Sequence, residues 1–408
     1  MVPPTWPHTE PEERSLDAGA HTSGPSLASV VDRAGAVGLQ RLLVVAWRDR
    51  DDAGAGGSEL HLSTILAAWR RAGLDLVLRT GAVAGQPARV DRDGYPTIRR
   101  GGAHGTFVRT PLAEIVKRTP ADGLVEVWHG LSFAAPLWNR RPSVAIAHHV
   151  HQHQFGQVLP GPLARIARVA EAKVYPRLYR RTPIVTLSES ARSEFAALGY
   201  DPAMIHVASP GVSEAFVPGR AADRPTLLTV GRLMPQKRVA TIIELAATLR
   251  RDHPDLELDV VGDGPLRPEV EALIDRVDGR RWIRLRSSLP VEQLVELYQR
   301  AWVVVSASEA EGWGMSLSEA AATGTPTVAT DISGHRDVVI DGRTGVLVRS
   351  DADLVAETAR LLGDAALRSR LGDAAIERAQ ELTWDRCAAG TLEPLVVQAE
   401  QAAQGTQR

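Results

Sequence analysis

Short apolar runs alternate with amphipathic stretches along most of the chain. Each run is flanked by polar or turn-forming residues, and the stretches between the runs carry apolar residues at helical spacing. This alternation predicts parallel α/β sheets whose strands are covered on both faces. The runs that predict strands lie at residues 40–47, 75–80, 123–130, 143–149, 183–190, 226–233, 256–264, 282–286, 302–308, 325–330 and 344–348.

The stretches between the runs predict helices. One lies at 58–73, with Ser58 as its expected N-cap, and another lies at 239–251. A helix of small residues is predicted at 315–323, and a last helix at 383–398 follows the final strand.

The alternation breaks once, at residues 207–225, which are rich in Pro, Gly and Ala. Such a stretch is typical of a linker, so the pattern predicts two doubly wound halves of similar size. In open α/β sheets, ligands bind beyond the carboxyl ends of the strands. Two such halves facing each other would form a cleft, and we expect candidate functional residues directly after strands.

Composition narrows the class of protein. Hydrophobic residues make up 44% of the 408 residues and charged residues 24%, as in soluble globular proteins. The net charge of −2 gives no reason to expect a nucleic-acid partner. The single cysteine, Cys387, excludes an intramolecular disulfide and is typical of a reducing cytosol. No run is long enough to span a bilayer and the first 25 residues lack a signal-peptide pattern, so we expect a cytoplasmic protein.

The stretch "GRLMPQKR" directly follows the apolar run "TLLTV". Gly231 permits a tight turn and lets a ligand approach the backbone. Arg232 and Lys237 follow it, and a guanidinium can hold phosphate oxygens bidentately while an ammonium acts as a point charge. The pattern indicates a diphosphate site, with a solvated basic loop as the alternative.

The stretch "EGWGMSLSE" follows the run at 302–308. Gly312 and Gly314 keep side chains away from the start of the next helix, where backbone N–H groups and the helix dipole favour an anion. Glu311 and Glu319 are acceptor-only when ionised, which suits sugar hydroxyl groups. The alternative is a helix with a solvated glutamate face.

With these two stretches together, the chain resembles the retaining glycosyltransferase family 4, of the GT-B fold, from residue 41 to about residue 398. The resemblance implies that Arg232 and Lys237 hold the diphosphate of a sugar nucleotide. It further implies that Glu311 holds the sugar and Glu319 the ribose. Trp313 stands where the family more often has Phe, and should close the same pocket. The implied donor-binding residues are Gly56, Gly57, Gly231, Arg232, Lys237, Gly262, Gly264, Glu311, Gly312, Trp313, Gly314, Met315, Ser316, Leu317 and Glu319.

Two further glycine turns follow predicted strands. "AGAGGSEL" resembles the glycine pair after the first strand of many family members, so Gly56 and Gly57 would bring backbone N–H groups toward donor phosphate or acceptor. A flexible loop with a capped helix is the alternative. "VVGDGPLR" contains Gly262 and Gly264, which the resemblance places near the nucleotide. It has Arg267 where a dinucleotide fingerprint needs a third glycine, which argues against a dinucleotide site.

The stretch "HHVHQH" carries His148, His149, His151 and His153. Three of them share one face of an extended chain, so a metal site is one interpretation. No Cys or acidic residue accompanies them, and the resemblance implies chemistry without a metal. By position it implies His148 beside the reacting sugar carbon, with His149 as the alternative or as an acceptor contact. Ser188 in "SESAR" is expected as a helix cap or as an acceptor contact.

The segment at 161–183 is basic and has apolar residues at helical spacing. Four apolar residues share one helical face: Leu163, Ile166, Ala170 and Val174. A membrane-surface role, peripheral at the inner membrane face, is one interpretation. An ordinary amphipathic helix with a solvated face is favoured, because Pro176 interrupts the stripe.

Together these observations predict a GT-B glycosyltransferase with two Rossmann-like doubly wound domains facing a central cleft. The expected organisation is a disordered leader (1–38), an acceptor-binding domain (39–208), a linker or hinge (209–224), an NDP-sugar-binding domain (225–382) and a helix crossing back to the first domain (383–400).

The expected reaction transfers a sugar from an NDP-sugar, a UDP- or GDP-sugar, to an acceptor hydroxyl with retention of configuration at the anomeric carbon. Natural-product, inositol, lipid and saccharide acceptors all stay open, and no cofactor, metal or nucleic acid is expected. The expected catalytic residues are His148, Arg232, Lys237 and Glu311. We expect a monomer or homodimer. The alternatives are a sugar-nucleotide epimerase or phosphorylase, a catalytically inactive binding protein of the same fold, and a nicotinamide-dependent oxidoreductase.

Overall fold

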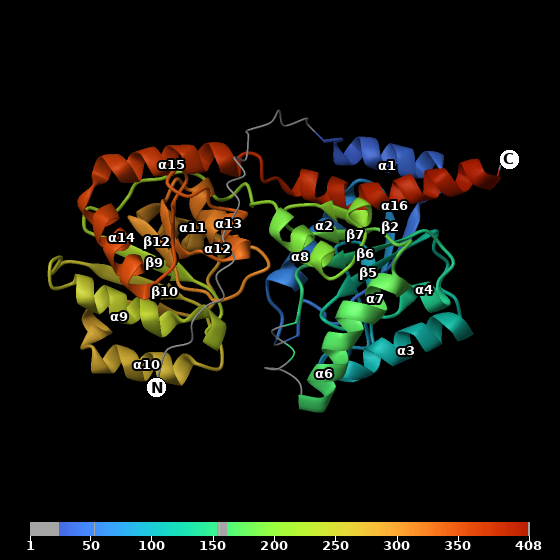
Figure 1. Cartoon of the computed structure of the whole chain (residues 1–408), viewed down its shortest axis with the longest axis horizontal. Helices are drawn as coiled ribbons and strands as arrows, with labels where there is room; N and C mark the ends of the chain where they lie inside the picture. Colours follow the sequence, from blue (N-terminus) through green and yellow to red (C-terminus); the bar gives the residue numbers. More distant parts are fainter. Residues whose placement is uncertain (1–23, 53, 153–154, 156–160, 407–408) are drawn as a thin grey trace.

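The computed structural model describes residues 24–52, 54–152, 155 and 161–406. Within these residues the chain forms two α/β halves, each built around one sheet (Figure 1). The predicted α/β class is confirmed, and each of the apolar runs contains a strand. Residues 1–23 of the predicted leader, and the candidate His153, lie outside the described residues.

The first half carries an eight-stranded sheet in the order β3-β4-β2-β1-β5-β6-β7-β8. All its pairs are parallel except β3 with β4, an edge hairpin that the sequence analysis missed. Its turn, Asp93-Gly94, has positive φ at both residues, which is the geometry that joins two-residue hairpins. The strands are β1 (Arg41–Val45), β2 (Asp75–Thr80), β3 (Arg89–Arg92), β4 (Tyr95–Arg99), β5 (Gly123–Trp128), β6 (Ser143–Ala147), β7 (Ile184–Thr186) and β8 (Ile205–Val207).

Helices cover both faces of this sheet. Val44 and Ile146 pack in one core cluster with residues of α1, α2 and α16, while Val45 and Ala147 point to the opposite face. That opposite face carries α3, α4 and α7 (Figure 1). The helices are α1 (Leu27–Ala36), α2 (Gly57–Arg71), α3 (Gly102–Val116), α4 (Ala135–Trp138), α6 (Gly161–Val169), the π-helical turn η1 (Ala170–Val174), α7 (Tyr175–Leu178), α8 (Glu189–Ala197) and the 3₁₀ turn η2 (Pro202–Met204).

Helix α1 corrects one expectation. The leader at 1–38 was expected to be disordered, but Leu27–Ala36 form a helix that packs along α16. Val30 is fully buried in the core of the first half, and Arg33 pairs with Glu393 of α16 at 2.7 Å. The apolar spacing in this segment buries enough surface to order it once its partner helix is in place.

The second half carries a six-stranded, wholly parallel sheet in the order β11-β10-β9-β12-β13-β14. The strands are β9 (Thr226–Val230), β10 (Glu257–Val261), β11 (Ile283–Arg286), β12 (Val303–Ser306), β13 (Thr327–Thr330) and β14 (Val346–Val348). The helices are η3 (Pro235–Lys237), α9 (Val239–Leu249), α10 (Arg267–Arg276), η4 (Gly279–Arg281), α11 (Val291–Arg300), α12 (Met315–Ala322), α13 (Ser333–Arg336), α14 (Asp351–Gly363), α15 (Ala365–Ala379) and α16 (Trp384–Thr406).

The chain passes between the halves twice, and the two crossings touch. The N–H of Val212, on the way out, donates to the carbonyl of Leu382, on the way back, at 2.9 Å. Helix α16 then runs beside α1 on the first half (Figure 1) and buries Leu392 and Leu395 completely. It extends further than the predicted 383–398.

The basic segment at 161–183 also differs from its prediction. Residues 161–178 form one continuous helical stretch, in which the π-turn η1 precedes α7 and accommodates Pro176 at the start of α7. The apolar residues expected to face the core, such as Leu163 and Ile166, are instead exposed, and Ala164 and Ala167 are buried. Within the described residues, no helix is long and apolar enough to cross a membrane.

The crossing predicts a sensitive glycine. A Cβ at Gly211 would lie 2.2 Å from the backbone nitrogen of Trp384, which cannot yield as a flexible side chain could. We expect Gly211→Ala to lower the free energy of unfolding by about 1–3 kcal/mol, measured by thermal and urea denaturation. Gly363→Ala is the control, because a Cβ there meets nothing within 4 Å. If the two variants melted alike, the crossings would not be rigidly packed.

Candidate active site

Four loops meet between the halves, and three of them follow strands at which the strand order reverses, while the loop after β6 lies one strand further along the first sheet. In the first sheet the reversal falls between β1 and β5, and in the second between β9 and β12. In doubly wound sheets, ligands bind in the crevice at such points. The candidate residues follow these strands: Gly56 after β1, His148 after β6, Arg232 after β9 and Glu311 after β12.

In the second half, the loops after β9 and β12 are tied together by an ion pair. The ammonium of Lys237 contacts the carboxylate of Glu311, which also accepts a hydrogen bond from the hydroxyl of Ser308 at 2.9 Å. The backbone repeats the link, since the N–H of Glu309 donates to the carbonyl of Gln236 at 2.8 Å. Both charged groups are partly shielded from water, so their attraction is stronger than at an open surface.

Gly262 and Gly264 support this arrangement from the neighbouring strand β10. A Cβ at Gly262 would lie 1.9 Å from the carbonyl oxygen of Gly231, and one at Gly264 would lie 2.5 Å from that of Leu233. Both glycines also have positive φ. The predicted donor-side turns are therefore in backbone contact, which only glycine permits at these two positions.

The turn before α12 places its residues in two layers. Gly314 is the N-cap, and Met315 and Ser316, at the start of the helix, are half-buried. Trp313 and Leu317 are buried in the core behind them. The N–H groups of Gly314 and Met315 donate to the carbonyls of Gly334 and Trp313, at 3.2 and 3.1 Å, so among the described residues Ser316 has the N–H of this group without a backbone acceptor. Trp313 and Leu317 hold the turn in position.

Glu319 lies further along α12 and is held by an aromatic hydroxyl. Tyr298 Oη donates to Glu319 Oε2 at 2.7 Å. Burial raises the pKa of Glu319 to about 7, although the hydrogen bond from Tyr298 opposes that shift. The carboxyl group therefore changes its charge close to neutral pH.

The halves touch across the cleft at glycine turns of both halves. Arg232 donates through Nη1 to the carbonyl of Gly54 at 3.3 Å, and its guanidinium carbon lies 3.4 Å from where a Cβ of Gly56 would be. On the other side, the ring of His149 lies 3.0 Å from where a Cβ of Gly312 would be. A Cβ at Gly312 would press on the His149 ring, whereas a Cβ at Gly56 would make an ordinary van der Waals contact with Arg232. The Gly312 turn therefore limits how close the halves can come on that side.

His148 lies at the end of a buried chain of polar contacts. Its Nε2 lies 3.3 Å from Nδ1 of His61 on α2, and Nε2 of His61 lies 3.3 Å from Sγ of Cys387 on α16. Nδ1 of His148 is buried and has no hydrogen-bond partner among the described residues. Burial lowers the pKa of His148 well below its usual value, and the neighbouring His61 lowers it further, so the ring is neutral at pH 7.

A second contact network fixes the start of α2. Glu59 Oε2 accepts the N–H of Gly56 at 2.7 Å, and its other oxygen lies 3.3 Å from Nε2 of His129. Burial acts to raise the pKa of Glu59, but hydrogen bonds and the charge of His129 outweigh it and lower the pKa to about 2. The N-cap is thus Gly56, and the expectation of Ser58 as the cap is wrong.

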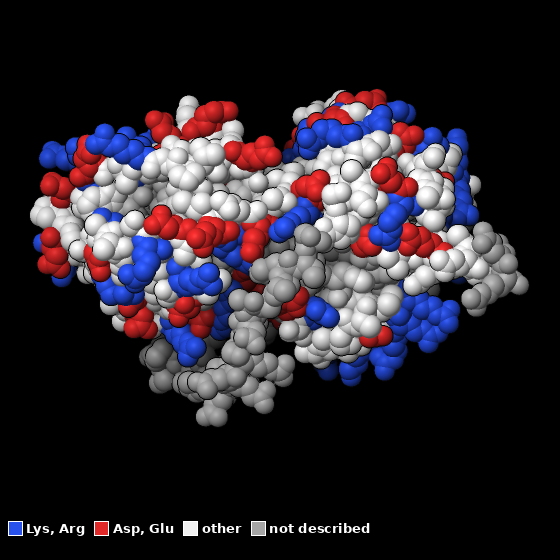
Figure 2. Space-filling view, turned by 90° about the horizontal axis from the view of Figure 1, so that it is seen from above, with Lys and Arg blue, Asp and Glu red and all other residues white. Residues whose placement is uncertain are grey.

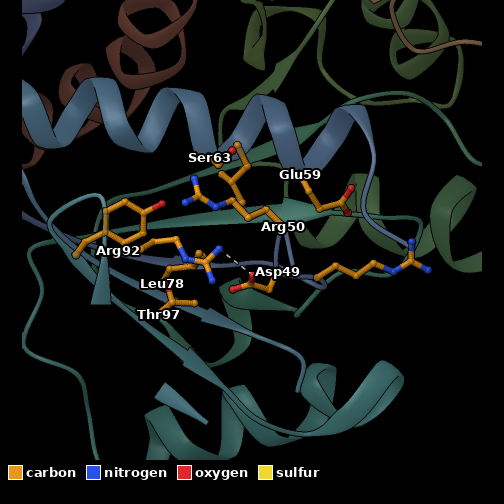
Figure 3. Close-up of a pocket in the computed structure, with 10 residues that line it drawn as sticks. Asp49, Arg50, Glu59, Ser63, Leu78, Arg92 and Thr97 are labelled. Carbon is orange, nitrogen blue, oxygen red and sulfur yellow. Dashed lines mark hydrogen bonds and ion pairs between the residues drawn. The ribbon is translucent and has the colours of Figure 1, made fainter. Parts of the chain in front are cut away.

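The loop after β1 is anchored by buried ion pairs. Arg99, on β4, is almost fully buried and reaches both oxygens of Asp49, at 3.1 and 3.0 Å, and also Asp51 at 2.7 Å. Arg92 joins the same two acids, and Figure 3 shows it reaching Asp49 in the pocket beside α2. Because each charged group in this cluster is paired with a group of opposite charge, the cluster holds the loop that carries Gly56 in place.

The remaining candidates have structural partners. Ser188 accepts the N–H of Ala191 at 3.1 Å and caps α8, which confirms the capping alternative for this residue. His151 lies 3.5 Å from Glu171, and its ring lies 4.2 Å from that of His149. Within the described part of the chain, no group of three or more His, Cys, Asp or Glu could hold a metal ion.

Several residues that shape this site were missed in the sequence. Glu59 follows Gly56 by three residues, a capping-box spacing that could have been found. His61, His129 and Arg99 carry no such local signal, because each contacts residues far away in the chain. The sequence therefore indicated the residues that face the cleft but few of those that hold them.

Two family models match the two halves of the chain. Residues 55–216 match glycosyltransferase family 4, and residues 213–378 match glycosyl transferases group 1. The D-inositol 3-phosphate glycosyltransferase of Kribbella flavida is 32% identical over 318 residues, which is 70% of this chain and 74% of that protein. The enzyme of the same name from Streptomyces bingchenggensis is 32% identical over 257 residues, 57% of this chain, so the match spans only 56% of that relative's length.

Solved structures share the fold at low identity. Sucrose-phosphate synthase from Thermosynechococcus elongatus matches with a TM-score of 0.72 and 20% identity, covering 90% of this chain and 99% of that one. Anabaena Alr3699/HepE, solved with UDP-glucose, matches with a TM-score of 0.67 and 16% identity, covering 90% and 99%. With the family models and the Kribbella relative, this agreement shows that the chain belongs to glycosyltransferase family 4, in glycosyl transferases group 1, and has the GT-B fold.

Proposed function

We propose that the protein transfers a sugar from a nucleoside-diphosphate sugar to an acceptor hydroxyl, with retention at the anomeric carbon. The observation that carries the proposal is the convergence of Arg232, Lys237 and Glu311 at the contact between the halves. Two cations suit a diphosphate, and a carboxylate suits the hydroxyls of a sugar. Family membership supports the same reaction class.

The Lys237–Glu311 ion pair explains how the site remains stable without its substrate. Each charge neutralises the other, which offsets the cost of holding them away from water. A donor that enters between them would give Lys237 a phosphate oxygen and Glu311 a sugar hydroxyl. The pair therefore favours a ligand that carries an anion and a polyol side by side, as a sugar nucleotide does.

The proposed transfer breaks the bond between the anomeric carbon and the diphosphate, and forms a bond from that carbon to the acceptor oxygen on the same face. The electron pair and the negative charge leave with the diphosphate, where Arg232, Lys237 and the N-terminus of α12 stabilise them. A diphosphate oxygen takes the acceptor proton, so no carboxylate nucleophile is needed.

His148 fits a positioning contact in this reaction. A neutral imidazole can donate or accept a hydrogen bond but cannot act as a cation, and Nδ1 has no partner within the described residues. We assign it the sugar hydroxyl nearest the reacting carbon. His149, which lies against Gly312, is the alternative for the same contact.

A cyclitol is the first acceptor class to test. Two relatives at 32% identity are D-inositol 3-phosphate glycosyltransferases, so we propose a polyol hydroxyl related to inositol as the acceptor. The test incubates the purified protein with UDP-, GDP-, dTDP- and ADP-sugars and with inositol phosphates, followed by mass spectrometry and NMR of the anomeric centre. An inverted product would contradict retention, and an isomerised donor would instead favour the epimerase alternative.

The diphosphate contact can be tested by charge removal. We expect Arg232→Ala and Lys237→Ala each to lower kcat/KM by about 10²- to 10³-fold, because each removes a cation from the leaving group. Arg238→Ala is the matched control, since Arg238 lies in the same loop but its charge is paired with two exposed acids, Asp351 and Glu309. Steady-state kinetics and donor-induced thermal stabilisation provide the two readouts.

The outcomes separate the alternatives. Equal losses in all three variants would show that loop charge alone matters, and would contradict the assigned contacts. Donor stabilisation without turnover or donor hydrolysis, across the acceptor panel, would favour the catalytically inactive alternative.

The raised pKa of Glu319 predicts a pH dependence of donor binding. An ionised Glu319 accepts two ribose hydroxyls, so we expect donor affinity to increase with pH up to about 7, by at most about tenfold per unit, and then to level off. Calorimetric titration with the nucleoside diphosphate measures it. Glu319→Gln keeps the shape but cannot ionise, so its affinity should be flat over this range. A parallel pH slope in Glu319→Gln would assign the dependence to another group.

A further inference from the structure

The sheet face that carries α3 and the α6–α7 segment exposes an unusual amount of apolar surface. Of the thirteen large apolar side chains exposed among the described residues, nine lie on α3, α4, α6 and η1. On α3 they are Val108, Leu112, Ile115 and Val116, between 55% and 85% exposed, at the spacing of a single helical stripe. Such a stripe would normally face a core. Its exposure therefore indicates a surface that binds a partner.

A second stripe lies on the helical stretch that begins with α6. Leu163, Ile166, Val169 and Val174 are between 48% and 64% exposed. The short side chains of Ala164 and Ala167 face inward instead, and they are sufficient to seat this helix. The larger apolar side chains of this stretch therefore lie at the outer surface and do not contribute to the core.

Both stripes lie on the same face of the first sheet. Phe107 of α3 packs 4.7 Å from Phe133 between ring centroids. The carboxyl of Glu126 accepts both the N–H of Phe133 and the hydroxyl of Tyr179, which follows α7. The segment around Phe133 thus joins the two helices beneath their exposed stripes. We refer to the exposed surface of 105–118 and 161–181 as the apolar-basic face.

The charges on this face have one sign. Nine exposed cations lie in these two stretches: Arg109, Lys117, Arg118, Arg165, Arg168, Lys173, Arg177, Arg180 and Arg181. The two stretches contain two acids, Glu114 and Glu171, and both are buried among internal partners. Among the described residues, no carboxylate pairs with any of the nine cations. The opposite side, with α1 and α16, instead shows acidic and basic side chains intermixed (Figure 2).

Three of these cations line an open groove on the face. It is formed where η1 and α7 meet the end of α8, and Lys173, Arg177 and Arg180 lie along it beside Pro176. Three cations around a depression, without a carboxylate, suit a phosphate group.

We propose that the apolar-basic face binds the surface of an anionic lipid bilayer. The apolar side chains would enter the boundary between head groups and acyl chains, while the arginines and lysines stay at the level of the lipid phosphates. A second copy of the chain fits less well, because a two-fold contact through this face would oppose nine cations to nine cations. The face lies on the first half, outside the cleft residues, so this proposal does not rest on the proposed function.

Vesicle binding tests the proposal. The full chain is floated with vesicles of phosphatidylcholine alone, or of phosphatidylcholine with phosphatidylglycerol, at low and high salt. We expect binding to the anionic vesicles only, weakened by salt. Ile115→Asp, Ile166→Asp and Arg168→Glu should each weaken it by roughly tenfold. Val291→Asp, on the second half and 40% exposed, is the matched control and should bind as the original chain does.

Three results would overturn the proposal. One is that the chain does not bind anionic vesicles, and another is that Val291→Asp weakens binding as much as Ile166→Asp. The third is light scattering that shows a dimer which Ile166→Asp splits, because the face would then be occupied by a second copy. Thermal melting with and without sugar nucleotide should be the same in all variants, since the substituted side chains are exposed and none of them is a candidate cleft residue.

Discussion

The packed double crossing between the halves is the constraint on which the rest of the structure depends. Gly211 lies against the backbone of Trp384, and Val212 is hydrogen-bonded to Leu382, so the chain leaves and re-enters the first half at one point. From there α16 is anchored by buried leucines in the first core. Two Rossmann-like domains that are connected by a single linker could adopt many relative orientations. Two crossings tied together at one point limit how the halves can be placed relative to each other, and in the structure the loops of the two halves face one another across the cleft.

Glycines and buried polar contacts determine the shape of the cleft. Where the halves meet, glycines at positions 56 and 312 leave room for a guanidinium and an imidazole from the opposite half. Behind these contacts, buried polar groups hold the loops in place: Arg99 on Asp49, Glu59 on the N–H of Gly56, and His61 beside His148. Preorganisation of this kind lets charged groups act on a ligand without first rearranging.

The sequence indicated the two sheets and the residues around the cleft because both have local signals. Apolar runs predicted strands correctly, and glycine-bracketed charged turns led to Arg232, Lys237 and Glu311, which the structure brings to one place. The hairpin of β3 and β4 escaped because its polar residues do not form an apolar run. The exposed stripe on α6 was misread because periodicity shows that a helix has an apolar side, but not whether that side faces protein or solvent. Contacts such as His61 with Cys387, which are 326 positions apart, have no signature in a single sequence.

The position of Cys387 gives the protein a reporter of its own opening. It is the only thiol in the chain and lies on the buried side of α16 against His61, and burial raises its pKa to about 12. Thiols react with alkylating reagents as thiolates, so in the packed state this one is protected twice, by access and by protonation. Modification then requires α16 to lift from the first sheet. The rate at which this thiol is labelled therefore reports how often α16 detaches from the first half.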